Sequence, residues 1–210
     1  MYVGVVVAYN PQREEICKNI DTYINELDVL YVVDNSSKNN GDIFNGYNKV
    51  KYIPNYDNLG ISAALNIGAK EAINNKYKWI LTMDQDSHFE KDAISKMKEY
   101  INNSDKTNEK LGIVSPFHST KRTEGIKLEG VDYPILVMTS GNLLNLEAYL
   151  DVGGFPEWYF IDCVDFDFCL ALRKKGYEIA QINDAVLQHE LGDTVRRQIG
   201  KKVFYLDNHN

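Results

Sequence analysis

The chain has 210 residues, 44% hydrophobic and 25% charged, which is enough for a substantial core in one large domain or two small ones. A net charge of -7 argues against nucleic acid or an anionic membrane surface as a partner. Three cysteines without a CxxC spacing argue against a disulfide framework and a zinc knuckle, and no apolar run is long enough for a membrane span. We therefore expect a cytoplasmic chain with reduced thiols.

The amino-terminal residues have the pattern of a βαβ unit. Residues 2–8 are apolar on both faces and β-branched, which predicts a central parallel strand. Apolar residues at helical spacing then predict a helix to about Glu26, and residues 29–33 predict a second buried strand. Because such crossovers are right-handed, we expect Tyr9 and Asp34, which follow the two strands, at the same edge of the sheet.

A weaker strand and a helix rich in small residues come next. Residues 50–54 predict the strand, and the helix is expected from about Gly60 to Asn75. Small residues allow a helix to pack closely on a sheet, so the segment has a purely structural interpretation. Equally, the amino terminus of this helix near Asn58 and Gly60 is suited to binding a diphosphate.

The most informative stretch is an apolar strand from Trp79 that ends in two carboxylates, Asp84 and Asp86. Side chains alternate along an extended strand, so both carboxylates are expected on one side, where they could share a cation. The alternative is a polar turn in which Asp86 or Ser87 caps the next helix. That helix is predicted over residues 90–101 and is followed by a polar loop to Lys110.

The second half has less regular patterns. Residues 111–116 and 131–139 predict two further strands, separated by a charged excursion over residues 119–129. Residues 146–149 predict a short helix, and residues 185–190 predict a last strand that carries His189 near its end. A single histidine is more often structural than a ligand, but this one ends a strand, as Asp86 does.

Three carboxylates, Asp162, Asp165 and Asp167, lie among large apolar side chains before a helix that continues to Lys175. Carboxylates in such surroundings are candidates for a raised pKa and for general base catalysis. The alternative is an ordinary helix start, with Asp162 as the cap and the other two carboxylates solvated.

Several short motifs occur in a consistent order along nearly the whole chain. They are Val7-Ala8-Tyr9-Asn10-Pro11, Val33-Asp34-Asn35-Ser36-Ser37, Asn58-Leu59-Gly60 with Ala63, Asn66 and Gly68, Met83-Asp84-Gln85-Asp86-Ser87, Ser140-Gly141-Asn142, Gly153-Gly154-Phe155, Phe160-Ile161-Asp162 through Asp165, Gly176-Tyr177, and His189 through Gly192-Asp193. Each motif is weak alone, but the ordered set resembles the family 2 glycosyltransferases, in their bacterial rhamnosyltransferase-like branch.

The resemblance implies an α/β fold of the GT-A, Rossmann-like type, with a mostly parallel central sheet flanked by helices. It also implies a single domain over residues 1–210. Residues 1–110 would form a nucleotide-sugar-binding half, and residues 111–210 a smaller acceptor-binding half.

The same resemblance implies roles at the donor site. Tyr9 would lie against the nucleotide base, and Asp34 would accept a hydrogen bond from the imide of uracil or thymine. Asp84 would contact the ribose or a metal-bound water, Asp86 would ligate a divalent cation (Mn²⁺ or Mg²⁺), and His189 would complete the metal site. Further donor contacts are expected from Ala8, Asn10, Asn58, Gly60, Asn66 and Gln85.

On the acceptor side, Asp165 matches the position of the family's catalytic base, and acceptor contacts are expected from Ser140, Gly141, Asn142, Trp158 and Asp162. The family often has Glu-Asp at the base position, whereas this chain has Val164-Asp165. Asp162 and Asp167 therefore stay open as substitutes.

The function implied is metal-dependent, inverting transfer of a sugar to a hydroxyl of a cell-surface polysaccharide or lipid-linked glycan. The donor expected first is dTDP-rhamnose, and a UDP-sugar second. Relatives continue into a further, partly apolar helical segment, so we expect a chain truncated at its carboxyl end, and peripheral membrane contact would belong to the missing part. The alternatives are a non-catalytic nucleotide-sugar-binding module and a sugar nucleotidyltransferase. The latter is disfavoured because residues 9–13 lack a Gly-rich basic loop.

Overall fold

The computed structural model describes the backbone of residues 1–104, 110–120, 129–189, 194–199 and 202–207, and side chains up to residue 189. Parts of two predicted loops, residues 105–109 and 121–128, lie outside these ranges, as do Glu190 and the motif that follows His189.

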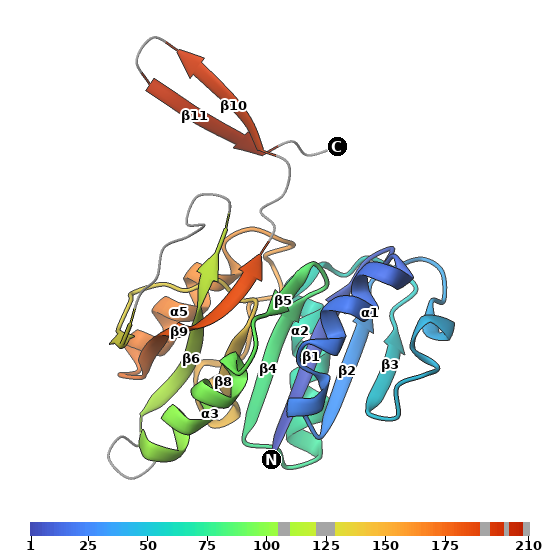
Figure 1. Cartoon of the computed structure of the whole chain (residues 1–210), viewed down its shortest axis with the longest axis horizontal. Helices are drawn as coiled ribbons and strands as arrows, with labels where there is room; N and C mark the ends of the chain where they lie inside the picture. Colours follow the sequence, from blue (N-terminus) through green and yellow to red (C-terminus); the bar gives the residue numbers. More distant parts are fainter. Residues whose placement is uncertain (105–109, 121–128, 190–193, 200–201, 208–210) are drawn as a thin grey trace.

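Four parallel strands form the first half of the central sheet, as the sequence predicted (Figure 1). Their order is β3 (Val50–Pro54), β2 (Val29–Asp34), β1 (Tyr2–Ala8) and β4 (Trp79–Asp84). In the registers, Ala8 of β1 lies beside Asp34 of β2, and Val7 beside Asp84 of β4. The carboxyl ends of these strands therefore meet at one edge of the sheet, where open α/β sheets bind ligands.

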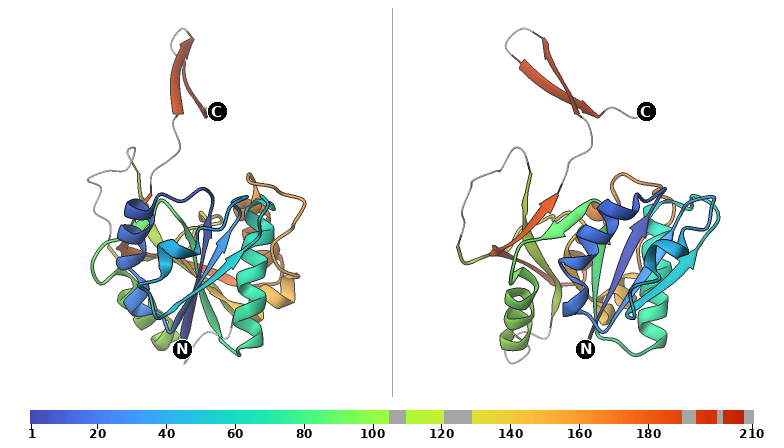
Figure 2. Two further views of the ribbon diagram at one scale, coloured as in Figure 1. Left: turned by 90° about the vertical axis from the view of Figure 1, so that its right-hand side faces the viewer. Right: turned by 45° about the vertical axis from the view of Figure 1, so that its right-hand side comes forward.

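Helices cover both faces of this sheet (Figure 2). One core contains side chains of α1 (Arg13–Asp21) and α3 (Ala93–Ser104). The other contains side chains of α2 (Gly60–Asn74), α4 (Leu146–Val152) and α5 (Val164–Lys174). Strand β1 contributes to both cores, which explains why its sequence is apolar on both faces.

The second half of the sheet is mixed. Its strands are β8 (Asn142–Asn145), β6 (Leu111–Ser119), β9 (Glu178–His189), β5 (Ser87–Phe89) and β7 (Val131–Asp132). β8 is antiparallel to both β4 and β6, β6 is parallel to β9, and β5 and β7 pair antiparallel with β9. The sheet is thus continuous from one half of the chain to the other, through β4 and β8.

Several predicted boundaries were wrong. The helix expected to Glu26 ends at Asp21, and a short 3₁₀ turn, η1 (Ile24–Glu26), follows; a second one, η2 (Gly41–Phe44), was not predicted. The strand expected over residues 131–139 stops at Asp132, because Pro134 cannot donate a ladder hydrogen bond and Ile135 is 64% exposed.

Two expected helix caps are absent. Ser87 begins strand β5 after a turn at Gln85 and Asp86, and the next helix starts only at Ala93. Asp162 does not cap α5, whose N-cap residue is Cys163 with a φ of 67°. The alternative interpretation, in which Asp86 and Asp162 cap the helices that follow them, is therefore wrong for both residues.

Residues 194–207 contain a two-stranded antiparallel sheet of their own, β10 (Thr194–Ile199) with β11 (Lys202–Asp207). Among the described residues, no helix combines the length and apolar character that crossing a membrane requires.

Candidate active site

The carboxyl ends of β1 and β4 are held together by the side chain of Gln85. Its amide nitrogen donates to the Tyr9 carbonyl at 3.1 Å, and its amide oxygen accepts from the Tyr9 N–H at 2.9 Å. The backbone of Asn10 is fixed from the other side by Ser36, whose Oγ accepts from the Asn10 N–H at 2.7 Å. The amide of Gln85 therefore fixes the loop that carries Tyr9, which is 50% exposed. Gln85 also lines the cavity described below, so its predicted contact with the donor stays a prediction.

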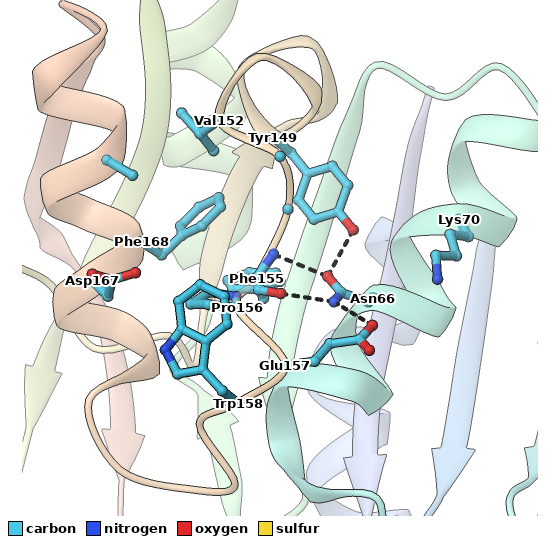
Figure 3. Close-up of a pocket in the computed structure, with 13 residues that line it drawn as sticks. Asn66, Lys70, Tyr149, Val152, Phe155, Pro156, Glu157, Trp158, Asp167 and Phe168 are labelled. Carbon is cyan, nitrogen blue, oxygen red and sulfur yellow. Dashed lines mark hydrogen bonds between the residues drawn. The ribbon is translucent and has the colours of Figure 1, made fainter.

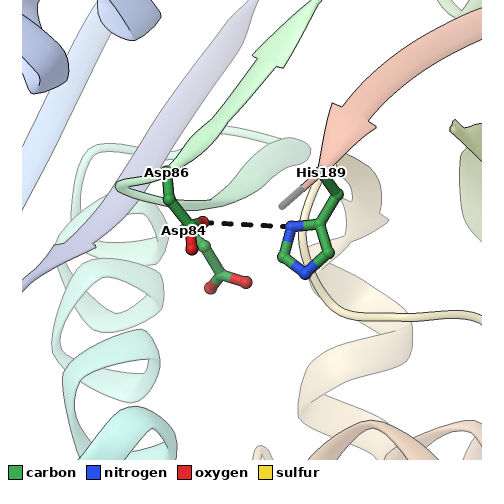
Figure 4. A group of neighbouring side chains, drawn as sticks. All are labelled: Asp84, Asp86 and His189. Carbon is green, nitrogen blue, oxygen red and sulfur yellow. Dashed lines mark ion pairs between the residues drawn. The ribbon is translucent and has the colours of Figure 1, made fainter. Parts of the chain in front are cut away.

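Asp84, Asp86 and His189 come together beside this loop (Figure 4). One ligand atom from each lies within 4.8 Å of the others, and the His189 Nδ1 is 3.9 Å from Asp86 Oδ1. The pairing of β5 with β9 explains how a residue so distant in the sequence reaches the carboxylates, because Ser87 lies directly opposite His189 in the register.

Electrostatics make this cluster suitable for a cation. Burial, together with the nearby Asp86 and Asp165 carboxylates, raises the pKa of Asp84 to about 7. A bound divalent cation would favour the charged form of Asp84 and relieve the repulsion. Two carboxylates and one imidazole are a ligand set that Mn²⁺ accepts and that leaves positions for phosphate oxygens. The residues present therefore fit the expected metal.

A cavity of about 320 Å³ opens between this cluster and the amino terminus of α2. It is lined by Val7, Tyr9, Asn35, Asn58, Gly60, Ile61, Asp84, Gln85, Asp86, Phe160 and Ile161. We call it the donor cavity, after the ligand that the sequence resemblance implies. Gly60 has a φ of 81°, and a Cβ at this position would collide with the Phe160 backbone. The Ile61 N–H also donates to the Phe160 carbonyl at 2.8 Å, so the second half of the chain closes one wall.

Asp34 directly precedes Asn35, which lines this cavity, and is itself fully buried. One carboxylate oxygen accepts from the N–H and the hydroxyl of Ser36, and the other from Asn40 Nδ2 at 2.9 Å and the Tyr52 hydroxyl at 2.7 Å. These four bonds fill the acceptor positions of a carboxylate. A hydrogen bond from the imide of a base would have to displace Asn40 or Tyr52. Ala8, its neighbour in the register, is also fully buried.

Asp165 lies in the first turn of α5, close enough to the cluster to raise the pKa of Asp84. One of its oxygens accepts from the Phe166 N–H at 2.9 Å. Burial first, and then the charge of Asp162, raise the pKa of Asp165 above its usual value. Asp162 is exposed, and Asp167 lines a different cavity, so only Asp165 among the three is both half-buried and near the cluster.

The Ser140-Gly141-Asn142 motif contacts the cluster through hydrogen bonds to Asp84 and Ser87. The Ser140 hydroxyl accepts from the Asp84 N–H at 3.1 Å and donates to the Ser87 hydroxyl at 3.0 Å, and Ser87 lies 2.7 Å from His189 Nδ1. Gly141 has a φ of 84°, and Asn142 donates to the Met138 carbonyl at 2.7 Å. Ser140 and Asn142 are buried, so the structure does not present them to an acceptor.

Two side chains in this region were not assigned a site role from the sequence. Ser87 was interpreted only as a turn or cap residue, and His118 was not considered. The His118 Nε2 is 2.7 Å from the Ser140 carbonyl, and burial lowers the pKa of His118 to about 4, so the ring is neutral at pH 7. Ser87 directly follows Asp86 in the quoted motif, but its contact with His189 depends on the pairing of β5 with β9. No local pattern marks His118, which the distant strand β6 brings to the site.

A second cavity, of about 400 Å³, lies between α2 and α5 (Figure 3). Its lining includes Lys70, Glu157, Asp167 and Trp158, whose side chain is 79% exposed. We call it the Trp158 cavity.

Asn66 was predicted to contact the donor, but it lies at the Trp158 cavity, where its amide holds residues 153–157. The oxygen accepts from the Tyr149 hydroxyl and the Phe155 N–H, and the nitrogen donates to the Phe155 carbonyl and to Glu157. These bonds fill all four positions of the amide, and the residue does not line the donor cavity.

Comparisons with known proteins give one consistent result. A family model described as Glycosyl transferase family 2 matches residues 5–177. The dTDP-rhamnosyl transferase RfbF of Shigella flexneri is 28% identical over 214 residues, which cover 90% of this chain and 69% of that protein.

Solved structures of glycosyltransferases share the GT-A fold. A crystal structure of GalNAc-T7 with UDP, GalNAc and Mn²⁺ aligns with a TM-score of 0.75 and 12% identity, over 91% of this chain and 44% of that one. Residues 1–349 of S. aureus TarS in complex with UDP-GlcNAc align with a TM-score of 0.73 and 16% identity, over 91% of this chain and 59% of that one. This chain therefore spans less than two thirds of the length of either structural relative.

Proposed function

Because this chain belongs to glycosyl transferase family 2, we propose that it is a metal-dependent, inverting glycosyltransferase that uses a nucleotide-sugar donor. The observation that carries this proposal is the cluster of Asp84, Asp86 and His189, whose two carboxylates line the donor cavity, with Asp165 close enough to affect the pKa of Asp84. Carboxylates with raised pKa values beside a cation-binding set suit base catalysis next to a diphosphate leaving group.

In the proposed reaction, Asp165 takes the proton of an acceptor hydroxyl, and the resulting oxygen nucleophile attacks the anomeric carbon of the donor sugar. The bond from this carbon to the diphosphate oxygen breaks, the electron pair leaves with the nucleoside diphosphate, and the configuration inverts. A divalent cation held by Asp86, His189 and Asp84 would offset the negative charge that develops on the diphosphate. The amino terminus of α2, at Gly60, lies on the same cavity and favours negative charge.

For the donor, dTDP-rhamnose is our first choice and a UDP-sugar the second. The similarity to a dTDP-rhamnosyl transferase supports the first, and the apolar lining from Val7, Ile61, Phe160 and Ile161 suits a deoxysugar or a thymine methyl group. We propose that Tyr9, half-exposed at the cavity, lies against the pyrimidine, while Asp34 fixes the loop below it.

For the acceptor, we propose a glycan or lipid-linked glycan that reaches Asp165 along the segment carrying Trp158. An exposed indole beside the carboxylates of Glu157 and Asp167 is suited to a sugar ring, which offers both an apolar face and hydroxyls. Asp162, exposed on the same segment, could contribute a further contact.

The test is donor turnover. Purified protein incubated with dTDP-rhamnose or a panel of UDP- and GDP-sugars, with Mn²⁺, is expected to release the nucleoside diphosphate slowly even without acceptor. Release of pyrophosphate instead would indicate a nucleotidyltransferase. Donor binding with no release, even when candidate acceptor glycans are added, would indicate a non-catalytic binding module.

Metal dependence gives the first mutational prediction. Nucleoside diphosphate affinity should rise at least about tenfold when Mn²⁺ replaces EDTA, and Asp86→Ala should abolish this increase because a ligand is lost. Isothermal titration calorimetry measures both affinities, and Glu99→Ala, which removes an exposed carboxylate on α3 outside the cluster and the donor cavity, is the control. Equal affinity of the unmutated protein in EDTA and in Mn²⁺ would contradict the metal site.

A further inference from the structure

Two buried serine hydroxyls connect the proposed metal ligands to one another. Ser87 is 0% exposed and Ser140 is 1% exposed. The Ser87 Oγ lies 2.7 Å from His189 Nδ1 and 3.4 Å from Asp86 Oδ1, while Ser140 joins Ser87 to the backbone of Asp84. One hydroxyl therefore contacts two of the proposed ligands, and a second contacts the backbone of the third.

The direction of these hydrogen bonds follows from the backbone. The Asp84 N–H can only donate, so the Ser140 Oγ accepts from it, and the Ser140 proton is directed to the Ser87 Oγ. Ser87 then keeps one lone pair and its own proton for its remaining partners, His189 and Asp86. Of these two contacts the one to His189 Nδ1 is shorter by 0.7 Å (3.4 against 2.7 Å).

We propose that Ser87 is the positioning residue of the metal site: it holds the His189 ring and turns its proton from His189 to Asp86 when a cation binds. When the ring is neutral and no cation is bound, Ser87 donates to His189 Nδ1, and the ring carries its one proton on Nε2. A cation on Nε2 requires the proton on Nδ1, which then donates to the Ser87 Oγ, while Ser87 donates to Asp86 Oδ1. The imidazole moves one proton from Nε2 to Nδ1 and gains or loses none.

The proposed role of Ser87 depends on which nitrogen of the His189 ring it contacts. Since Nδ1 is already in contact with Ser87, Nε2 is the nitrogen left for a metal, and histidine ligands are commonly oriented by a hydrogen bond at their other nitrogen. Ser87 satisfies its hydrogen bonds in both states because a hydroxyl accepts two bonds and donates one. This step rests on the proposed metal-dependent function, but the ring orientation does not.

The experiment uses protein labelled with ¹⁵N-histidine, which gives a tractable NMR spectrum because the chain has 4 histidines. His189→Ala identifies the His189 signals. In metal-free protein we expect the His189 proton on Nε2. When Mg²⁺ is bound, we expect the proton on Nδ1; Mg²⁺ is used here because it is diamagnetic. Ser87→Ala should mix the two forms in metal-free protein and lower Mn²⁺ affinity by about 10–100-fold in calorimetry.

Ser115→Ala is the matched control, because Ser115 is also 0% exposed and lies on a strand of the same sheet, with its hydroxyl bonded to the Pro116 carbonyl. It should leave the His189 form and Mn²⁺ affinity unchanged while lowering thermal stability to a similar extent. Ser140→Ala, the second variant, keeps the contact of Ser87 with His189 and should show an intermediate loss of Mn²⁺ affinity.

Two results would overturn the inference: Ser87→Ala with native Mn²⁺ affinity and one His189 form, or metal-free native protein with the proton already on Nδ1. If the native protein binds no Mn²⁺, the metal dependence proposed above fails, and the comparison of His189 between native protein and Ser87→Ala still decides whether Ser87 orients the ring.

Discussion

At the scale of single residues, Asp165 is the side chain on which the proposed chemistry depends. Asp165→Asn keeps the size of the side chain and much of its hydrogen bonding but cannot accept a proton. Turnover should fall by about 10²–10⁴-fold with donor affinity nearly unchanged, measured by steady-state kinetics and by calorimetry with the nucleoside diphosphate.

Asp162→Asn and Asp167→Asn test the two alternative bases, since both carboxylates lie on the same segment and helix as Asp165. A large loss of turnover in either control with none in Asp165→Asn would transfer the role of base. Loss of donor affinity in Asp165→Asn would instead indicate that Asp165 is structural.

Asp84 predicts an unusual dependence of stability on pH. Its pKa is raised from 3.8 to about 7 in the folded protein, so the folded state holds a proton that the unfolded state has lost between these values. Stability of metal-free protein should therefore fall as pH rises from about 4 to above 7. Asp84→Asn removes this loss, and at pH 8 it should melt about 2–4 °C or more above the unmutated protein.

Differential scanning calorimetry in EDTA at pH 5 and pH 8 measures this difference, with Asp57→Asn as the exposed control. Mn²⁺ should reverse the order at pH 8, because the native protein, with a third charged ligand, binds the cation more tightly than the variant. An Asp84→Asn variant that is less stable than the native protein at pH 8 in EDTA would contradict the pKa argument.

The sequence predicted which residues lie at the site better than it predicted the hydrogen-bond partners of their side chains. Asp84, Asp86 and His189 were predicted as one set, and the structure brings them together. Asn66 and Gln85 were both predicted as donor contacts. The Asn66 amide bonds residues outside the donor cavity, whereas Gln85 lines that cavity while its amide also bonds the backbone of Tyr9. A motif in one sequence cannot separate these uses, because hydrogen-bond partners depend on tertiary contacts.

At the scale of elements, the parallel strands were predictable because buried strands of this type are continuous apolar runs. Strand β8 was missed because its four residues begin and end with asparagine, and the first part of β9 because polar residues such as Gln181 and Asn183 interrupt it. These strands are determined by pairing with β4 and β6, a contact that local periodicity does not contain.

The connection between α2 and residues 153–157 gives a prediction at this scale. Asn66→Ala removes four hydrogen bonds and leaves the N–H and carbonyl of Phe155 without these partners. Unfilled buried groups cost about 1–3 kcal/mol each, so the melting temperature should fall by several degrees. Asn74→Ala, at the exposed end of the same helix, should stay within about 0.5 kcal/mol of the native protein. Equal stability of the two variants would show that Asn66 does not hold this segment.

At the scale of the whole molecule, the central sheet is continuous across the two halves of the chain. Strand β4, from the first half of the chain, pairs with β8 from the second, and both cores contain residues of both halves. The donor cavity is likewise lined from both halves, by Tyr9 and Asp84 on one side and Phe160 on the other. A donor nucleotide bound in this cavity, as proposed, would therefore contact only the folded arrangement of the two halves.

This arrangement predicts one cooperative unfolding transition that a donor nucleotide shifts as a whole. The chain has 2 tryptophans, of which Trp79 is 3% exposed on β4 and Trp158 is 79% exposed, so in Trp158→Phe the fluorescence reports on the sheet alone. We expect Trp79 fluorescence and far-ultraviolet circular dichroism to change at the same temperature. With Mn²⁺ and dTDP at about 100 times its Kd, mass action stabilises the fold by about 2.7 kcal/mol, which should raise both midpoints by about 5–10 °C.

Asp86→Ala should lose most of this rise in the unfolding midpoint while keeping one transition. Separate midpoints for the two signals, or a ligand shift confined to one of them, would instead mean that residues 1–110 and 111–210 fold as independent units and that the donor cavity is an interface between them.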